Sequence, residues 1–323
     1  MRKVYYNGKF VDETEANVSI YDSALMFGDM IFEMTRSFNK KQFRLKEHLQ
    51  RLYASAKYLR MNLESVMAME EMEEAVYETI KVNEPFFNDD DEHRIMIDVT
   101  RGLLSIYQEV VGTHKGLNII IADFPLRWTV RGMGELFDKG INAVIPSQRA
   151  IPASLLDPKV KNRSRIHYLM ANMQVSNYEG DNNWALLLDT DNFIAEGTGD
   201  NFFIVKDNVL YTPEPRNILR GISREYVFEI AKELGVQYRE CNLDVYDVAN
   251  ADEAFMTGTP FCILPVTSLD RQKIGTGEVG SMVKRLIKKW SDNVGLDFVA
   301  QIKDWNQKFD TGEITVSPYS FKN

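Results

Sequence analysis

The stretch Phe193-Ile194-Ala195-Glu196-Gly197-Thr198-Gly199-Asp200-Asn201-Phe202-Phe203 joins two apolar strands through a turn of small and polar residues. Glu196 ends the first strand, and the two glycines that follow allow a ligand to approach the backbone closely. A carboxylate at this position suits either a ligand-facing group or an ordinary acid in a hairpin turn. The stretch alone leaves both interpretations open.

The segments on either side predict a mixed fold in two parts. The first part alternates hairpins, helices and antiparallel strands, predicted at 3–11, 32–45, 49–59, 69–82, 94–100 and 117–124. The second part continues with strands and helices in blocks, predicted at 142–145, 167–178, 184–188, 193–196, 201–205, 223–234 and 279–290. A proline and two glycines interrupt the pattern between them, at Pro125, Gly132 and Gly134. We therefore predict an α+β fold with a small domain at 1–126, a linker at 127–134 and a larger domain at 135–323.

Composition excludes several classes of protein. The chain has 323 residues, and 47 acidic side chains outweigh 38 Lys and Arg to give a net charge of −9, which disfavours nucleic acid as a partner. No apolar run reaches the roughly 18 residues of a membrane span, and we expect no membrane contact. The N-terminal stretch lacks the apolar core of a signal peptide, and with only two cysteines we expect reduced thiols and a cytoplasmic protein. Four histidines and two scattered cysteines disfavour a metal site.

Other candidates for chemistry are weak when each is considered separately. Gly221-Ile222-Ser223 opens a predicted helix, which suits either a phosphate site or an ordinary helix cap. Thr257-Gly258-Thr259 follows a strand and offers hydroxyl and amide groups to an anion, or simply forms a tight turn. Arg51 and Arg36 suit phosphate or carboxylate, although a lone arginine is more often a surface cation. The segment 157–161 contains two lysines, the residue type that forms a Schiff base with an aldehyde cofactor, or two surface lysines.

Taken together and in order, these motifs resemble one family. The matching residues are Gly28-Asp29, Phe32-Glu33, Glu47-His48, Arg51 to Ala56, Asp157-Pro158 with Lys161, Glu196-Gly197-Thr198 with Asn201, Gly221 to Arg224, and Thr257 to Thr259. The chain resembles the class IV, fold-type IV pyridoxal-phosphate aminotransferases from about residue 4 to residue 290. That family includes branched-chain aminotransferases, D-amino acid aminotransferases and aminodeoxychorismate lyases. The resemblance implies a two-domain architecture like that of D-amino acid aminotransferase, and it is most specific at 51–56 and 196–203.

The resemblance also implies a role for each motif. Glu196 would face the pyridine nitrogen of pyridoxal 5'-phosphate and keep it protonated. The phosphate group would be held by side chains and helix-start amides, from Arg51, Ile222, Ser223 and Thr259. Tyr168 would lie near the ring oxygen of the cofactor, and the substrate pocket would be lined by Phe32, Arg36, Thr257, Gly258 and Thr259.

The lysine is the point where the chain departs from the family pattern. In the family the Schiff-base lysine lies four or five residues before the position of Tyr168, where this chain has Ser164 or Arg163. Counting forward from Asp157-Pro158 instead reaches Lys161, and an insertion of two residues would reconcile the counts. We therefore assign the Schiff base and the proton transfer to Lys161, in preference to Lys159. The alternative is a homologue that lacks the lysine and binds a ligand without catalysis.

The expected reaction is transfer of an amino group from a small amino acid to a 2-oxo acid. D-specific members carry an arginine and a histidine shortly after the position of Gly102, and this chain has the segment Leu103 to Tyr107 there. Branched-chain members have glycine after the glutamate matched by Glu33, and this chain has Met34. A branched-chain-like L-amino acid is our first choice, with a lyase of the aminodeoxychorismate type as the alternative. The resemblance also implies a homodimer.

Overall fold

The computed structural model describes residues 1–110, 112, 114–180 and 182–309. These residues fold into two compact units. The first unit contains residues 1–126 together with 160–165, and the second contains 127–159 and the residues from 166 onward. The segment that we predicted as a linker, 127–134, lies in the second unit.

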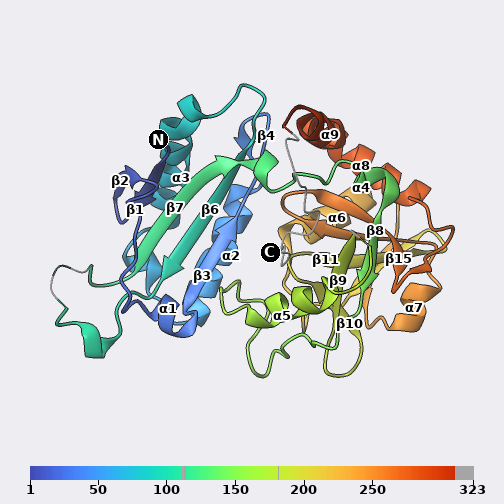
Figure 1. The fold of residues 1–323 in the computed structure, drawn as a ribbon, viewed down its shortest axis with the longest axis horizontal. Helices are drawn as coiled ribbons and strands as arrows, with labels where there is room; N and C mark the ends of the chain where they lie inside the picture. The colour runs from blue at the N-terminus through green and yellow to red at the C-terminus, as the bar shows by residue number, and fades with distance from the viewer. Residues whose placement is uncertain (111, 113, 181, 310–323) are drawn as a thin grey trace. The chain divides into compact units, whose positions relative to one another are not determined.

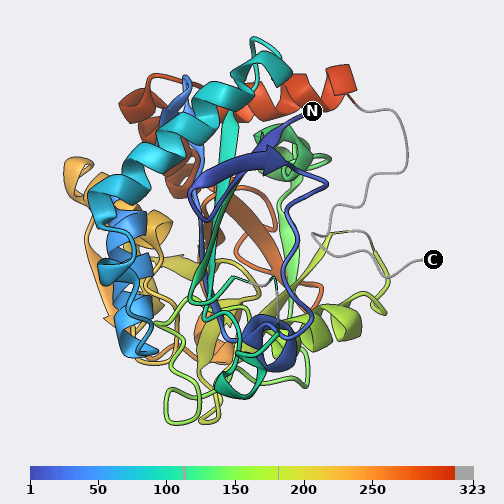
Figure 2. The same ribbon diagram turned by 90° about the vertical axis from the view of Figure 1, so that its left-hand side faces the viewer.

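The first unit is built on an antiparallel sheet with the strand order β2-β1-β7-β6-β3. Its strands are β1 (Lys3–Tyr6), β2 (Lys9–Asp12), β3 (Met30–Met34), β6 (His93–Thr100) and β7 (Asn118–Pro125). Two helices, α2 (Leu45–Tyr58) and α3 (Met69–Asn83), pack together on one face of this sheet (Figures 1 and 2). The antiparallel arrangement predicted from the sequence is therefore observed.

Alternation along β6 separates the two faces of the sheet. Ile95, Ile97 and Val99 point into the apolar core shared with α2 and α3. α2 contributes Leu45, Leu49, Leu52 and Ala56 to the same core, at helical spacing. The opposite face of β6 therefore receives Arg94, Met96 and Asp98.

The hairpin turn predicted at Asn39 and Lys40 is confirmed, but its predicted strands, 32–38 and 42–45, are wrong, because β3 pairs with β6 and a separate small hairpin follows it. That hairpin pairs β4 (Ser37–Phe38) with β5 (Lys41–Gln42) and turns at Asn39 and Lys40, both with positive φ. Both turn amides donate to the Glu92 carboxylate, at 2.7 and 3.0 Å. A contact from so distant a residue could not be read from the local pattern.

The buried His93 ring lies between two carboxylates of the first unit, the buried Asp123 and the exposed Glu84. Its Nδ1 lies 2.9 Å from Asp123 Oδ2 and its Nε2 lies 2.7 Å from Glu84 Oε2, while Lys40 also pairs with Glu84. Burial disfavours the charged ring, but the two carboxylates outweigh it and raise the pKa of His93. Burial also raises the pKa of Asp123 to about 6, against the opposing effect of His93.

We expect His93→Gln to lower the free energy of unfolding by roughly 1–3 kcal/mol near pH 6, the usual loss for hydrogen bonds to charged groups. A histidine whose pKa is raised on folding stabilises the folded state fully at pH values below its unfolded-state pKa of about 6.5. This stabilisation is lost as the pH rises through the folded-state pKa. Asp123 contributes at lower pH, because its folded-state pKa is raised only to about 6. The difference in melting temperature between wild type and variant should therefore shrink from pH 6 to pH 9. A difference that grew with pH would contradict this assignment.

The second unit contains a mixed sheet that closes on itself. Pairings run β10-β9-β8-β15-β14-β11 and return from β11 to β10, and β12, β13 and β16 extend the sheet. The strands are β8 (Ile141–Val144), β9 (Asn183–Leu188), β10 (Ile194–Gly197), β11 (Asn201–Lys206), β12 (Val209–Pro213), β13 (Tyr238–Cys241), β14 (Glu253–Gly258), β15 (Cys262–Leu269) and β16 (Gln272–Lys273). The pairs β8–β9, β8–β15 and β12–β13 are parallel, which the sequence did not predict.

Helices pack on this sheet from several parts of the chain (Figure 1). α5 (Ile166–Val175) packs on β9, and α6 (Ile222–Glu233) and α8 (Ser281–Val294) both contact β14. The short helices α4 (Leu136–Lys139) and α7 (Val245–Ala249) also belong to this unit. Beyond residue 297, where no motif could be interpreted, the structure forms α9 (Phe298–Phe309) and buries Phe298, Ile302 and Trp305. Among the described residues, none of the helices combines the length and apolarity needed to cross a bilayer.

Candidate active site

Glu196 is a buried carboxylate surrounded by hydrogen-bond donors. It is 4% exposed, so it is not a solvated turn acid. The Tyr168 hydroxyl donates to Oε1 at 2.8 Å, and the Asn201 amide donates to Oε2 at 3.0 Å. The backbone N–H of Leu219 also donates to Oε2, at 3.0 Å. Donors on both oxygens favour the charged form of a buried carboxylate.

The fold brings these groups together from three elements of the second unit. Glu196 on β10 pairs directly with Asn201 on β11 across the tight turn. Tyr168 lies on α5 and packs against the apolar cluster that contains Ala171 and Val175. The helix is held to the turn by hydrogen bonds at 3.2 Å between the side chains of Asn172 and Thr198.

Asn201 connects the Glu196 carboxylate to the loop that leads into α6. The Asn201 amide also donates to the Leu219 carbonyl at 2.9 Å, in the loop that precedes the helix. A Cβ at Gly221 would lie 2.1 Å from Asn201 Oδ1, so only glycine fits at the N-cap. None of the described side chains caps the helix there, which leaves the first-turn amides of Ile222 and Ser223 available to an anion.

The segment Thr257-Gly258-Thr259 lies on the next strand of the same sheet. Thr257 pairs with Asn201 across β11 and β14, and its hydroxyl donates to the Cys262 carbonyl at 2.6 Å. Thr259 stands in the turn between β14 and β15. The structure therefore gathers Glu196, Tyr168, the α6 start and this turn on neighbouring elements.

Arg51 belongs to a charged network in the first unit. Its Nε lies 2.6 Å from Glu33 Oε1 and its Nη2 lies 2.8 Å from Glu33 Oε2, while His48 Nδ1 lies 2.7 Å from Oε2. Burial opposes ionisation of Glu33, but Arg51 and His48 together hold its pKa well below the usual range. Burial lowers the pKa of His48, against the opposing effect of Glu33. The interpretation of Arg51 as a surface cation is wrong.

Lys161 lies in a short extended segment that pairs with β3. The Phe32 N–H donates to the Lys161 carbonyl at 3.0 Å, and the Arg163 N–H donates to the Met30 carbonyl at 2.9 Å. This pairing places the Lys161 amine 4.7 Å from the centre of the Phe32 ring. Lys159, by contrast, forms an ion pair with Asp157 at 2.8 Å and belongs to the second unit.

Two further cations, Arg36 and Arg94, are buried in the first unit. Arg36 is buried, with its Nε donating to the Ser37 carbonyl at 3.1 Å, so it is not a surface cation either. Arg94 was not singled out, although it is a charged residue in a strand whose alternate positions are apolar. It is 7% exposed, and its Nε and Nη1 have no hydrogen-bond partner among the described residues. Burial, Arg36 and Arg163 lower the pKa of Arg94 to about 9.

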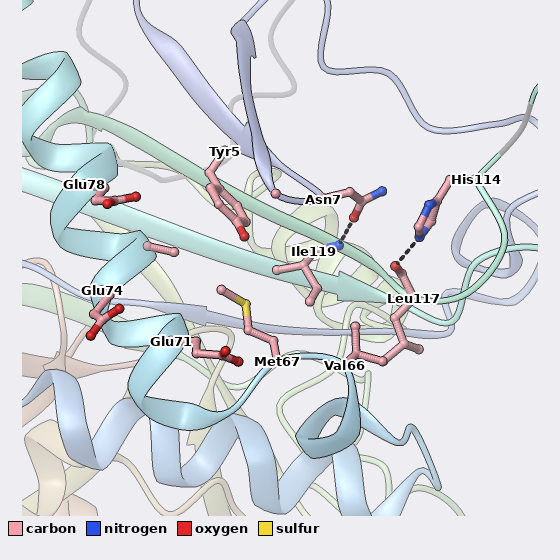
Figure 3. Close-up of a pocket in the computed structure, with 12 residues that line it drawn as sticks. Tyr5, Asn7, Val66, Met67, Glu71, Glu74, Glu78, His114, Leu117 and Ile119 are labelled. Carbon is pink, nitrogen blue, oxygen red and sulfur yellow. Dashed lines mark hydrogen bonds between the residues drawn. The ribbon is translucent and has the colours of Figure 1, made fainter.

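A separate cavity of about 400 Å³ lies between α3 and β1 in the first unit (Figure 3). Tyr5 and the glutamates Glu71, Glu74 and Glu78 surround an apolar floor that includes Met67. It contains none of the candidate residues proposed from the sequence. Within the described ranges, no group of three or more His, Cys, Asp and Glu side chains is arranged to hold a metal ion.

Comparison with known proteins gives a consistent result. The family model of amino-transferase class IV matches residues 30–269. A Methanocaldococcus jannaschii protein, provisionally named a branched-chain-amino-acid aminotransferase, is 40% identical over 90% of this chain and 96% of its own length. The Escherichia coli K12 branched-chain-amino-acid aminotransferase is 31% identical over 88% of this chain and 90% of its own.

The similarity extends to solved structures. The crystal structure of the T.th. branched-chain amino acid aminotransferase with pyridoxamine 5'-phosphate has a TM-score of 0.80 to this chain and is 31% identical. The match covers 91% of this chain and 94% of that one. The chain therefore belongs to the class IV aminotransferases, enzymes that use pyridoxal phosphate as their cofactor.

Proposed function

We propose that the protein transfers the amino group of a branched-chain-like L-amino acid to a 2-oxo acid, with Lys161 as the catalytic amine. The relatives named as branched-chain aminotransferases support this substrate class. The observation that carries the proposal is the surface around Phe32, where one sheet face combines apolar side chains with buried cations. Such a face accepts both an aliphatic side chain and a carboxylate.

The second unit fits the cofactor at two points. The α6 start offers uncapped amides and the positive end of a 12-residue helix, which suits the phosphate. Glu196 offers a buried carboxylate, which suits a protonated pyridine nitrogen. When bound, pyridoxal phosphate supplies a ring that takes up electrons from the substrate carbon. Thr259 and Arg51 would add hydroxyl and guanidinium contacts to the phosphate.

Each residue of the chain then has a definite task. Lys161 Nζ supplies the primary amine and carries a proton between two carbon atoms of the reacting groups. Glu196 holds a proton on the ring nitrogen, and Tyr168, which donates to Glu196, orients the carboxylate. Phe32 and the turn at Thr257 and Gly258 would line the substrate pocket.

Arg36 and Arg94 provide positive charge for the second substrate of the transfer, the partner of the aliphatic amino acid. A buried guanidinium with two N–H groups unpaired is costly unless an anion arrives. Arg94 therefore points to an acid with a second carboxylate, with Arg36 beside it, as the partner of the aliphatic substrate. Met34 bounds the same surface, because its Sδ lies 3.5 Å from Arg94 Nη2.

A half-reaction screen tests the substrate class. Purified holoenzyme is mixed with single amino acids, and conversion of its cofactor to the amine form is followed by absorbance. We expect L-leucine, L-isoleucine, L-valine and L-glutamate to convert the cofactor, and their D-isomers to fail. Conversion by D-isomers alone, or loss of a carbon fragment from the substrate in place of amine transfer, would favour a different member of the family.

We further propose that the protein is a homodimer. Helix α1 (Ser23–Phe27) exposes a set of large apolar side chains, with Leu25 62% and Phe27 67% exposed. Ile20 and Ile106 add to the exposed apolar surface of the same unit. An apolar surface of this kind is typical of a protein interface.

We expect sedimentation to give a dimer at micromolar concentration and Phe27→Asp to shift it toward monomer, because a charge would be buried in the interface. Tyr246→Asp is the matched control, since Tyr246 is also strongly exposed but lies in the second unit. A wild-type monomer, or an equal effect of both substitutions, would contradict the proposed interface. We also place the enzyme in the cytoplasm, a proposal supported by Cys241 and Cys262, which are thiols rather than a disulfide.

A further inference from the structure

The segment 160–165 is attached to the first unit, although the residues on both sides of it belong to the second. Apart from its two backbone hydrogen bonds to β3, it is held by Ser164, whose hydroxyl donates to the Phe27 and Gly28 carbonyls at 3.1 Å. The Lys161 N–H also donates to Ser55 Oγ at 3.3 Å. Because the segment has only six residues, we expect a side-chain contact as well to hold the Lys161 side chain in position.

The pairing of this segment sets up a row of side chains across three strands. Ile31 faces Asn162 in an antiparallel bridge, so Lys161 lies opposite Phe32. On its other side, Phe32 lies opposite Asp98 of β6. Lys161, Phe32 and Asp98 are therefore neighbours on one face of the sheet.

Arg163 crosses this row and connects its ends. Its guanidinium stacks over the Phe32 ring at 3.7 Å from the ring centre. Beyond the ring, its Nε and Nη2 reach Asp98 Oδ1 at 3.1 and 2.9 Å. The side chain thus ties the segment that carries Lys161 to a strand that is not its direct partner.

We propose that Arg163 and Asp98 are positioning residues, whose ion pair holds the Lys161 amine in place over Phe32. The inference rests on the proposed role of Lys161. None of the motifs that carry the family resemblance includes either residue, and Arg163 lies in the stretch where this sequence departs from the family spacing.

Burial makes this pair sensitive to the loss of either member. Asp98 is 5% exposed, and burial raises its pKa while Arg163 opposes the rise. Without Asp98, Arg163 would lose the carboxylate that it pairs with while still lying near Arg94, whose pKa it already lowers. The segment would then be expected to leave its register on β3.

Covalent labelling measures the position of the amine directly. The purified holoenzymes are saturated with pyridoxal phosphate and reduced with borohydride, and the pyridoxyl group on Lys161 is quantified against that on Lys159. In wild type we expect labelling to favour Lys161 by far. In Asp98→Asn and in Arg163→Gln, we expect the ratio to fall at least about tenfold in protein that is still folded, measured well below the melting temperature of each variant.

The pair predicts two further results. The double variant should be no worse than either single variant, because both remove one interaction. Asp98→Glu should restore most of the ratio, because it keeps the carboxylate, and Arg163→Gln carries the test if Asp98→Asn does not fold. Glu13→Gln is the control, since it breaks the exposed Arg2–Glu13 pair of the same unit.

The outcomes separate this inference from the proposed function. Wild-type labelling that avoids Lys161 overturns the catalytic assignment. Wild-type labelling at Lys161 together with an unchanged ratio in both single variants overturns the positioning role alone. Additive losses in the double variant would also overturn it, because they would mean that the two side chains act separately.

Discussion

Lys161→Ala should lose turnover by at least about 10³-fold, because general acid–base catalysis alone contributes roughly 10²–10⁴. Alanine removes the only primary amine in the segment 160–165. The arginines there stay protonated, and asparagine and serine do not form a Schiff base. Cofactor affinity should fall only in part, because the contacts proposed for the phosphate, at α6 and Arg51, are unchanged. Steady-state kinetics and the absorbance of the bound cofactor measure the two effects.

Lys159→Ala is the matched control. Lys159 is two residues away, has the same chemistry and forms an ion pair with Asp157 at 2.8 Å, a partly exposed contact that is worth little. We expect this variant to keep the turnover of wild type. Equal loss in both variants would mean that the loop conformation matters more than the amine, and full activity of Lys161→Ala would remove Lys161 from the mechanism.

Local patterns were sufficient to predict the surroundings of Glu196. β10 ends at Gly197 and β11 begins at Asn201, so alternation and two glycines predict the hairpin that places Glu196 beside Asn201. The start of α6 was also predicted, because glycine followed by a hydroxyl residue signals a helix N-terminus. These features depend on neighbours that are close in sequence.

The candidate residues of the first unit depend on contacts between distant segments. Arg163 reaches Asp98 from 65 residues away, and Lys161 faces Phe32 only because its segment pairs with β3. Arg94 looks like one exposed charge in a strand until Arg36 and Arg163 are seen beside it. No periodicity in the sequence reports such pairings, and the same reason explains why the parallel pairs of β8 were missed.

Glu196→Gln should keep the cofactor but lower turnover by about 10²–10³-fold, the usual effect of removing one electrostatic contact made to the reacting groups. The substitution preserves size, and the hydrogen bonds can be satisfied: the amide oxygen accepts from Asn201 and Leu219 where Oε2 does now. The amide nitrogen then faces the Tyr168 hydroxyl, which can accept as well as donate. The fold should therefore tolerate the change, and the melting temperature should stay within a few degrees of wild type.

The expected loss of turnover in Glu196→Gln results from removing the negative charge, because the hydrogen bonds to the side chain are kept. A neutral amide does not hold a proton on a ring nitrogen, so the ring would take up electrons less readily. Tyr168→Phe removes one donor to Glu196 and keeps the carboxylate, so its loss should be smaller than that of Glu196→Gln. Glu233→Gln removes an exposed carboxylate of the same unit, paired with Lys289, and should be silent. If Glu196→Gln turned over at the wild-type rate, the buried carboxylate would be a structural anchor for the loop before α6, and the proton on the ring would need another partner.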